Sequence, residues 1–127
     1  MTEGDESCEA IDRSVLASLR ELQDAGEPDI VAEVGGLFVK HAPEKISAIL
    51  QAVEKGDAKG LQIAAHSLKS SSAYVGAMHL SAMSKELELI GRSGTLEGVK
   101  DKIEKMRAEY ERVMAALEIE IKTADKR

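Results

Sequence analysis

The sequence predicts an all-α fold, an up-and-down antiparallel four-helix bundle with an additional short N-terminal helix. Apolar residues make up 43% of the 127 residues, whereas aromatic residues make up only 2% and prolines number two. Apolar side chains recur at steps of three and four residues, and no run alternates apolar and polar residues as a strand does. Short segments that contain glycine separate these runs, and short connections favour antiparallel neighbours.

The first two helices have recognisable local signals. Asp12 can cap a first helix, whose apolar stripe starts at Val15 and which Gly26 ends. Pro28 suits the first turn of a second helix, because its missing N–H has no partner there in any case. Pro43 either kinks this second helix or divides it into two, and the sequence leaves both readings open.

The remaining helices follow in the same way. Gly56 ends the second helix and Asp57 caps a third, which Gly76 breaks. A fourth helical stretch ends at residues 91–94, and Thr95 can cap the last helix. The apolar positions of the last helix form a narrow seam typical of bundles, with steps of three and four residues: Val99, Ile103, Met106, Tyr110, Val113, Leu117 and Ile121.

These signals predict a helical bundle domain at residues 11–122, between a flexible leader at 1–10 and a polar tail at 123–127. The net charge of −6 and the pI near 5.1 argue against a nucleic-acid surface. No apolar run approaches the roughly 20 residues of a membrane span, and the start is too acidic for a signal peptide. The lone Cys8 excludes an internal disulfide. We therefore expect a monomeric cytoplasmic protein, and Met1 favours a free-standing chain.

One helix face carries the candidate functional residues. With about 100° between successive residues, four side chains share an outward patch at i, i+3, i+4 and i+7. These are His66, Lys69, Ser70 and Ala73. A neutral imidazole has a lone pair that can accept a phosphoryl group and pass it on, and a lysine one turn away supplies a cation for the phosphoryl oxygens. Ser70 and Ala73 are short enough to let another protein approach.

Spacing alone is weak evidence for chemistry at this patch. An ordinary surface histidine beside an ordinary lysine explains the same pattern, and on spacing alone that explanation is favoured. The chain has no glycine-rich nucleotide loop, so a second protein would have to bring the phosphoryl group. It also has no Glu-x-x-His pattern, so we expect no metal site.

The segment around the histidine resembles the signature of histidine-containing phosphotransfer (HPt) domains of bacterial two-component phosphorelays. The matching residues are Ala65-His66-x-Leu68-Lys69-x-Ser71-Ser72-Ala73-x-x-Gly76-Ala77, and Leu80-Ser81-x-x-Ser84-Lys85-x-Leu87-Glu88 resembles the helix that follows. The resemblance covers roughly residues 11–121. It implies that His66 is phosphorylated, with Lys69 as its basic neighbour. It also implies that Glu88 and Arg92 lie at the edge of the docking surface. Helical spacing adds Ser70 and Ala73 from the outward patch and Ile63, which lies off the core stripe, as contacts of that surface.

The resemblance implies a carrier that passes a phosphoryl group between receiver-domain aspartates and has no ATP site or autokinase activity of its own. The implied partners are response-regulator receiver domains and hybrid sensor kinases, with no nucleic acid and no membrane. No cofactor is expected, and Mg²⁺ only in the partner receiver domain. Ser70 stands where the family usually has glycine, so a pseudo-HPt adaptor that binds without carrying phosphate stays open. A weaker alternative is a structural bundle that oligomerises through the seam of residues 99–121.

Overall fold

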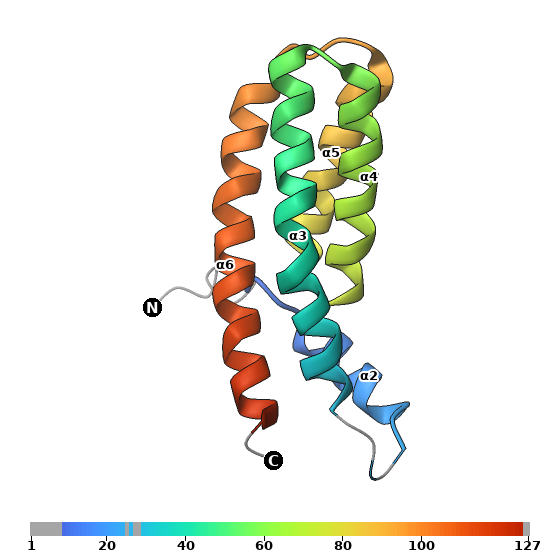
Figure 1. Ribbon diagram of the computed structural model, residues 1–127, viewed down its shortest axis with the longest axis vertical. Helices are drawn as coiled ribbons and strands as arrows, with labels where there is room; N and C mark the ends of the chain where they lie inside the picture. The colour runs from blue at the N-terminus through green and yellow to red at the C-terminus, as the bar shows by residue number, and fades with distance from the viewer. Residues whose placement is uncertain (1–8, 25, 27–28, 126–127) are drawn as a thin grey trace.

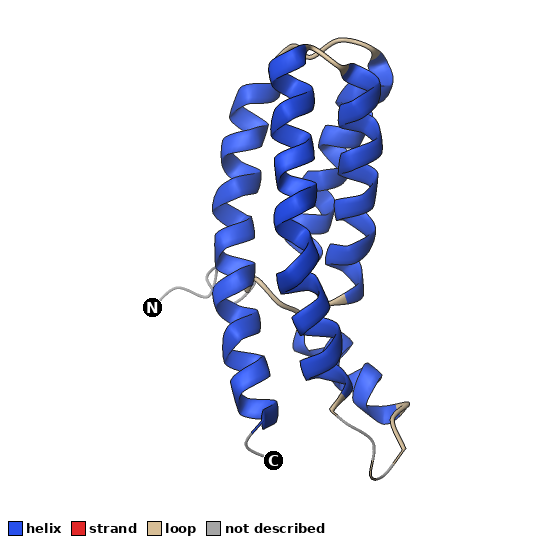
Figure 2. Cartoon of the chain, in the orientation of Figure 1, coloured by secondary structure: helices blue, strands red, loops and turns tan. Residues whose placement is uncertain are grey.

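The computed structural model describes residues 9–24, 26 and 29–125, and within them it contains helices and no strand (Figures 1 and 2). The helices are α2 (Arg13–Glu21), α3 (Ile30–Lys55), α4 (Ala58–Tyr74), α5 (Met78–Ser93) and α6 (Val99–Asp125). The last four run alternately up and down, and α2 is a short helix at the lower end of the bundle (Figure 1). The predicted all-α bundle is therefore confirmed.

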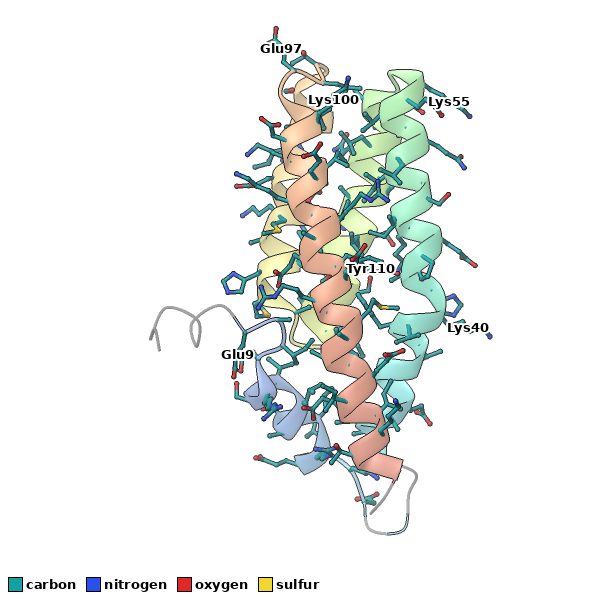
Figure 3. The ribbon with its side chains drawn as sticks, turned by 90° about the vertical axis from the view of Figure 1, so that its left-hand side faces the viewer. Glu9, Lys40, Lys55, Glu97, Lys100 and Tyr110 are labelled. Carbon is teal, nitrogen blue, oxygen red and sulfur yellow. The ribbon has the colours of Figure 1, made fainter. Side chains whose placement is uncertain are left out.

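The four long helices close into a ring. α4 packs against α3 and α5, and α6 packs against α5 and α3. The largest fully buried side chains are mostly leucines from all these helices: Leu16, Ile49, Leu61, Leu68, Leu80, Leu87, Met106 and Leu117. Lys40 and Lys55 project from α3 into solvent (Figure 3). The core of the bundle is thus mainly aliphatic and the outer surface of the bundle is charged, as the composition predicts.

The seam of the last helix lies inside this core. Val99, Ile103 and Met106 are buried, as are Val113 and Leu117 farther along. Most side chains of this seam are therefore packed within one chain and are not available to a second copy.

Several boundaries differ from the sequence prediction. α3 continues through Pro43 as one helix, and its cap is Asp29, whose carboxylate accepts a hydrogen bond from Val31 N at 2.8 Å. Pro28 lies outside the described residues. α2 ends at Glu21, before Gly26. α6 starts at Val99 rather than directly after Thr95, because Gly98 has a φ of +72°, in the left-handed region, and a right-handed helix can start only after it.

Core packing and the last helix extend slightly beyond the predicted domain limits of 11 and 122. Ala10 is 8% exposed and packs in the core cluster with Ile11, so the ordered domain begins before residue 11. Asp12 caps α2 as predicted, and its own amide donates to Gly76 O at 2.7 Å, tying this end to the α4–α5 turn. At the other end α6 extends to Asp125. Residues 1–8 and 126–127 lie outside the described residues.

Gly91 controls how closely α4 and α5 approach. It lies inside α5, whose left-handed C-cap is Gly94, so only Gly94 ends the helix as predicted. A Cβ atom at position 91 would lie 2.6 Å from both Ala58 O and Gln62 N of α4. Only glycine fits here, because the atoms that a Cβ would meet belong to the α4 backbone and cannot move aside as the end of a flexible side chain could. The contact sets the spacing at which the α5 side chains meet α4.

We expect Gly91→Ala to lower the free energy of unfolding by about 1–3 kcal/mol, because two helix backbones must separate to admit one methyl group. Urea denaturation measures this change. Gly36→Ala is the matched control, since a Cβ at Gly36 meets nothing within 4 Å. It should raise stability by up to about 1 kcal/mol through its helix propensity. A similar loss in both variants would mean that the close contact at Gly91 is not a constraint.

Candidate functional site

His66 lies on the outer face of α4, away from the buried stripe of its own helix. Leu61, Ala65 and Leu68 on that stripe are all 0% exposed, whereas the His66 side chain is 60% exposed. Helical spacing predicts this placement. The ring is open to solvent and can be reached by another protein.

A buried carboxylate lies behind the ring. Oε2 of Glu88, from α5, is 2.8 Å from His66 Nδ1, and the Glu88 side chain is only 5% exposed. The resemblance places Glu88 at the edge of a docking surface, and in the structure its side chain is buried behind the ring. Glu88 borders the buried stripe of α5, which includes Ser84, Leu87 and Gly91. Gly91 brings α5 against α4, so the side chain of Glu88, one turn earlier on α5, reaches the imidazole from the protein interior.

The carboxylate determines which ring nitrogen is free. An ionised carboxylate can only accept hydrogen bonds, so Nδ1 of His66 must carry the hydrogen and donate to Glu88. In a neutral ring the lone pair is then on Nε2, the other nitrogen. The exposed ring therefore offers a nucleophilic nitrogen whose position is set by the hydrogen bond at Nδ1.

Two cationic side chains also lie beside Glu88. Lys69 Nζ lies 2.8 Å from Oε1, and Arg92 Nη2 lies 3.6 Å from Oε2. The Lys69 ammonium and the His66 ring hold the pKa of Glu88 below its ordinary value of 4.5, although burial acts in the opposite direction. A buried charge is stable only when it is paired, so Lys69 and the His66 ring keep Glu88 ionised. Sequence reasoning assigned Lys69 to the phosphoryl oxygens alone and missed this second role.

The other predicted surface residues remain accessible. Ile63 is 61% exposed, Ser70 is exposed and Ala73 is half-buried. Ser70 leaves most of the ring open despite lying one turn away. Its neighbour Ser71 instead faces α3, where it accepts a hydrogen bond from Lys45 Nζ at 3.1 Å and donates to Ser67 O at 2.8 Å.

The role of Glu88 could have been found from one signal in the sequence. It is an acidic residue next to the buried positions of an amphipathic helix, and Arg92 follows it by one turn. The remaining histidines, His41 and His79, are exposed on α3 and α5. In the part of the chain that the structure describes, no three histidine, cysteine or acidic side chains form a group that could hold a metal ion. Nor does that part contain a helix long and apolar enough to cross a membrane.

A family model, two curated proteins and a solved structure that resemble this chain all describe the same kind of protein. The Hpt domain family model matches residues 33–116. Histidine-containing phosphotransfer protein 4 of Arabidopsis thaliana is 32% identical over 102 residues, which cover 79% of this chain and 80% of that protein. Histidine-containing phosphotransfer protein 5 of the same plant is 40% identical over 65 residues, covering 49% and 41%. The crystal structure of histidine-containing phosphotransfer protein B from Pseudomonas aeruginosa PAO1 superposes with a TM-score of 0.80 at 32% identity, covering 90% of this chain and 96% of that one.

The lowered pKa of Glu88 predicts a pH-dependent contribution to stability. The stabilisation is fully present above the ordinary value of 4.5 and is lost as the pH falls through the lowered pKa, because the carboxylate then takes up a proton. Glu88→Gln has no such group. The difference in unfolding free energy between wild type and this variant should therefore shrink as the pH falls below 4.5.

Urea titrations at a series of pH values measure this difference. Glu86→Gln is the control, since Glu86 lies on the same helix but is 57% exposed and pairs only loosely, at 3.4 Å, with Lys102. The difference in unfolding free energy between Glu86→Gln and wild type should stay small at every pH. If the unfolding free energies of wild type and Glu88→Gln instead changed in parallel as the pH fell below 4.5, Glu88 would not be held ionised by its neighbours.

Proposed function

The chain belongs to the Hpt domain family and is a histidine phosphotransfer protein of a phosphorelay, and on that premise we propose that His66 carries the phosphoryl group. The observation that supports this assignment most strongly is the hydrogen bond between His66 Nδ1 and the buried carboxylate of Glu88. It leaves an exposed ring with one nitrogen fixed and the other free. His41 and His79 lie outside residues 65–77, the segment that resembles the signature of the family.

The chemistry follows from this arrangement. Nε2 of His66 attacks the phosphorus of a receiver's aspartyl phosphate, the N–P bond forms, and the P–O bond to the aspartate breaks. The aspartate leaves as a carboxylate, and the ring, which keeps its hydrogen on Nδ1, becomes positively charged. Glu88 stabilises that charge through the hydrogen bond already in place. No base is needed, because no proton is removed, and the reverse reaction returns the phosphoryl group to another aspartate.

Two cationic side chains act in this scheme. Lys69 keeps Glu88 ionised while the ring is free, and Lys69 and Arg92 together place positive charge next to the site where the phosphoryl oxygens arrive. In this proposal Mg²⁺ comes with the receiver domain, and the transfer requires no cofactor from this chain. The sequence lacks a glycine-rich nucleotide loop, which supports a carrier without autokinase activity.

Members of this family interact with receiver domains and kinases in phosphorelays. For this chain the proposed partners are response-regulator receiver domains and hybrid sensor kinases, with the protein acting as a monomer in the cytoplasm. No observation favours an adaptor that binds without carrying phosphate. The reason to consider one was Ser70, and the His66 side chain remains 60% exposed beside it.

His66→Gln should abolish acid-labile labelling by a phosphorylated receiver while leaving the helical circular dichroism unchanged, since the exposed ring contributes little to the core. Incubation with radiolabelled receiver domains from the same genome measures the transfer. His79→Gln, an exposed histidine on the neighbouring helix, is the control and should be labelled like wild type. Equal labelling of the His66 variant would defeat the assignment.

Glu88→Ala should slow transfer about ten- to hundredfold, the rate equivalent of losing one hydrogen bond to a charged group. The effect should be on kcat, because Glu88 acts on the ring and lies beneath the surface that a partner touches. The KM for the receiver should change little. Glu86→Ala on the exposed face of α5 is the control and should transfer at the wild-type rate. A rise in KM with unchanged kcat would assign Glu88 to docking instead.

A further inference from the structure

Ser70 lies on the outward patch with His66, and among the described residues its hydroxyl has no hydrogen-bonding partner. Its neighbour Ser71, by contrast, donates to the carbonyl oxygen of Ser67, four residues earlier in α4. A serine inside a helix either makes such a bond or turns its hydroxyl to solvent. Ser70 is exposed, so its O–H group can donate to a molecule that arrives at the surface.

The residues one turn away from His66 lie on two sides of it. With about 100° between successive residues, Gln62 and Lys69 lie about 40° and 60° to one side of His66, and Ile63 and Ser70 lie about 60° and 40° to the other. The first side faces α5, because Lys69 Nζ is bonded to the buried carboxylate of that helix. On the second side, isoleucine cannot donate a hydrogen bond and serine can.

A phosphoryl group on Nε2 of His66 extends away from Glu88. The carboxylate holds Nδ1 at 2.8 Å, and the two nitrogens of an imidazole point in nearly opposite directions. Lys69 and Arg92, which are paired with the same carboxylate, approach the group from the α5 side. Ser70 follows His66 by four residues, a spacing at which Cβ atoms on a helix are about 5–6 Å apart. The phosphoryl oxygens on the side away from α5 therefore face the Ser70 hydroxyl.

We propose that the Ser70 hydroxyl donates a hydrogen bond to the phosphoryl group on His66 and thereby slows its hydrolysis. In hydrolysis a water oxygen bonds to phosphorus and the N–P bond breaks. Both protons of the water stay with the phosphate, and the ring leaves as neutral imidazole with its hydrogen on Nδ1. The inference rests on the proposed function, and it adds that Ser70 lengthens the time for which this chain holds its phosphoryl group between partners.

The direction of the effect follows from the transition state. Loss of a phosphoryl group passes through a loose transition state, in which the bond to the leaving nitrogen is largely broken. The phosphoryl oxygens lose negative charge as that bond breaks, so a hydrogen bond to them is stronger in the phosphorylated protein than in the transition state. An interaction that is stronger in the ground state raises the barrier.

Ser70→Ala tests the hydroxyl without any receiver. The isolated protein is phosphorylated with phosphoramidate, a small donor from which Nε2 takes the phosphoryl group as ammonia leaves. The donor is then removed, and the loss of phosphohistidine is followed by ³¹P NMR. We expect the half-life of phosphohistidine to shorten about two- to tenfold, the rate equivalent of one ordinary hydrogen bond. Because no receiver is present, altered docking cannot contribute to this change.

Two further variants separate the hydrogen bond from other effects. Ser70→Thr keeps a hydroxyl and should restore most of the half-life. Ser71→Ala is the matched control, because its hydroxyl faces α3, where Lys45 donates to it, and it should keep the wild-type half-life. Alanine is a better helix former than serine, so loosening of α4 cannot explain a shorter half-life in Ser70→Ala. Thermal melts followed by circular dichroism check this.

The outcomes distinguish this inference from the proposed function. If His66 is labelled and Ser70→Ala loses phosphate at the wild-type rate, the role of Ser70 is overturned and the carrier function stands. An equal shortening in Ser71→Ala, or a Ser70→Thr half-life as short as that of Ser70→Ala, would also overturn the hydrogen bond. If phosphoramidate labels no residue, or a histidine other than His66, the carrier assignment fails and the inference fails with it.

Discussion

The carboxylate of Glu88 is buried at the contact between α4 and α5, and the arrangement of the surrounding charges depends on it. Its two oxygens face different partners, Oε2 toward His66 and Oε1 toward Lys69, each at 2.8 Å. A charge removed from water at this depth must be paired, so the ring and the ammonium are held in fixed positions relative to each other. The reactive histidine is thus exposed to partners but oriented from inside the protein.

The fold makes this contact possible through the close approach of two helices. Gly91 lets the α5 backbone lie against Ala58 and Gln62 of α4, and Glu88 is one turn before it. The contact also explains why the site needs the whole bundle. An isolated α4 would present His66 and Lys69 on one face but would have no carboxylate to select the free nitrogen or to hold the lysine.

Features that depend on neighbouring residues in the chain could be predicted from the sequence. The exposure of His66 follows from helical periodicity, and the cap at Asp12 and the break at Gly56 follow from local residue preferences. Features that depend on how helices pack could not. The depth of Glu88 depends on the spacing of α4 and α5, and the burial of Ala10 depends on its contact with the finished core. The course of the chain at Pro43 was undecided for the same reason, since packing on both sides keeps α3 continuous.

The orientation of the ring by Glu88 is tested most directly by determining which nitrogen carries the phosphoryl group. Protein labelled with ¹⁵N at histidine and phosphorylated by a receiver can be examined by ¹⁵N and ³¹P NMR. We expect one phosphohistidine, at His66, with phosphorus coupled to Nε2 and a hydrogen retained on Nδ1. Phosphorus on Nδ1, or on a histidine other than His66, would contradict the claim that Glu88 holds the ring for transfer.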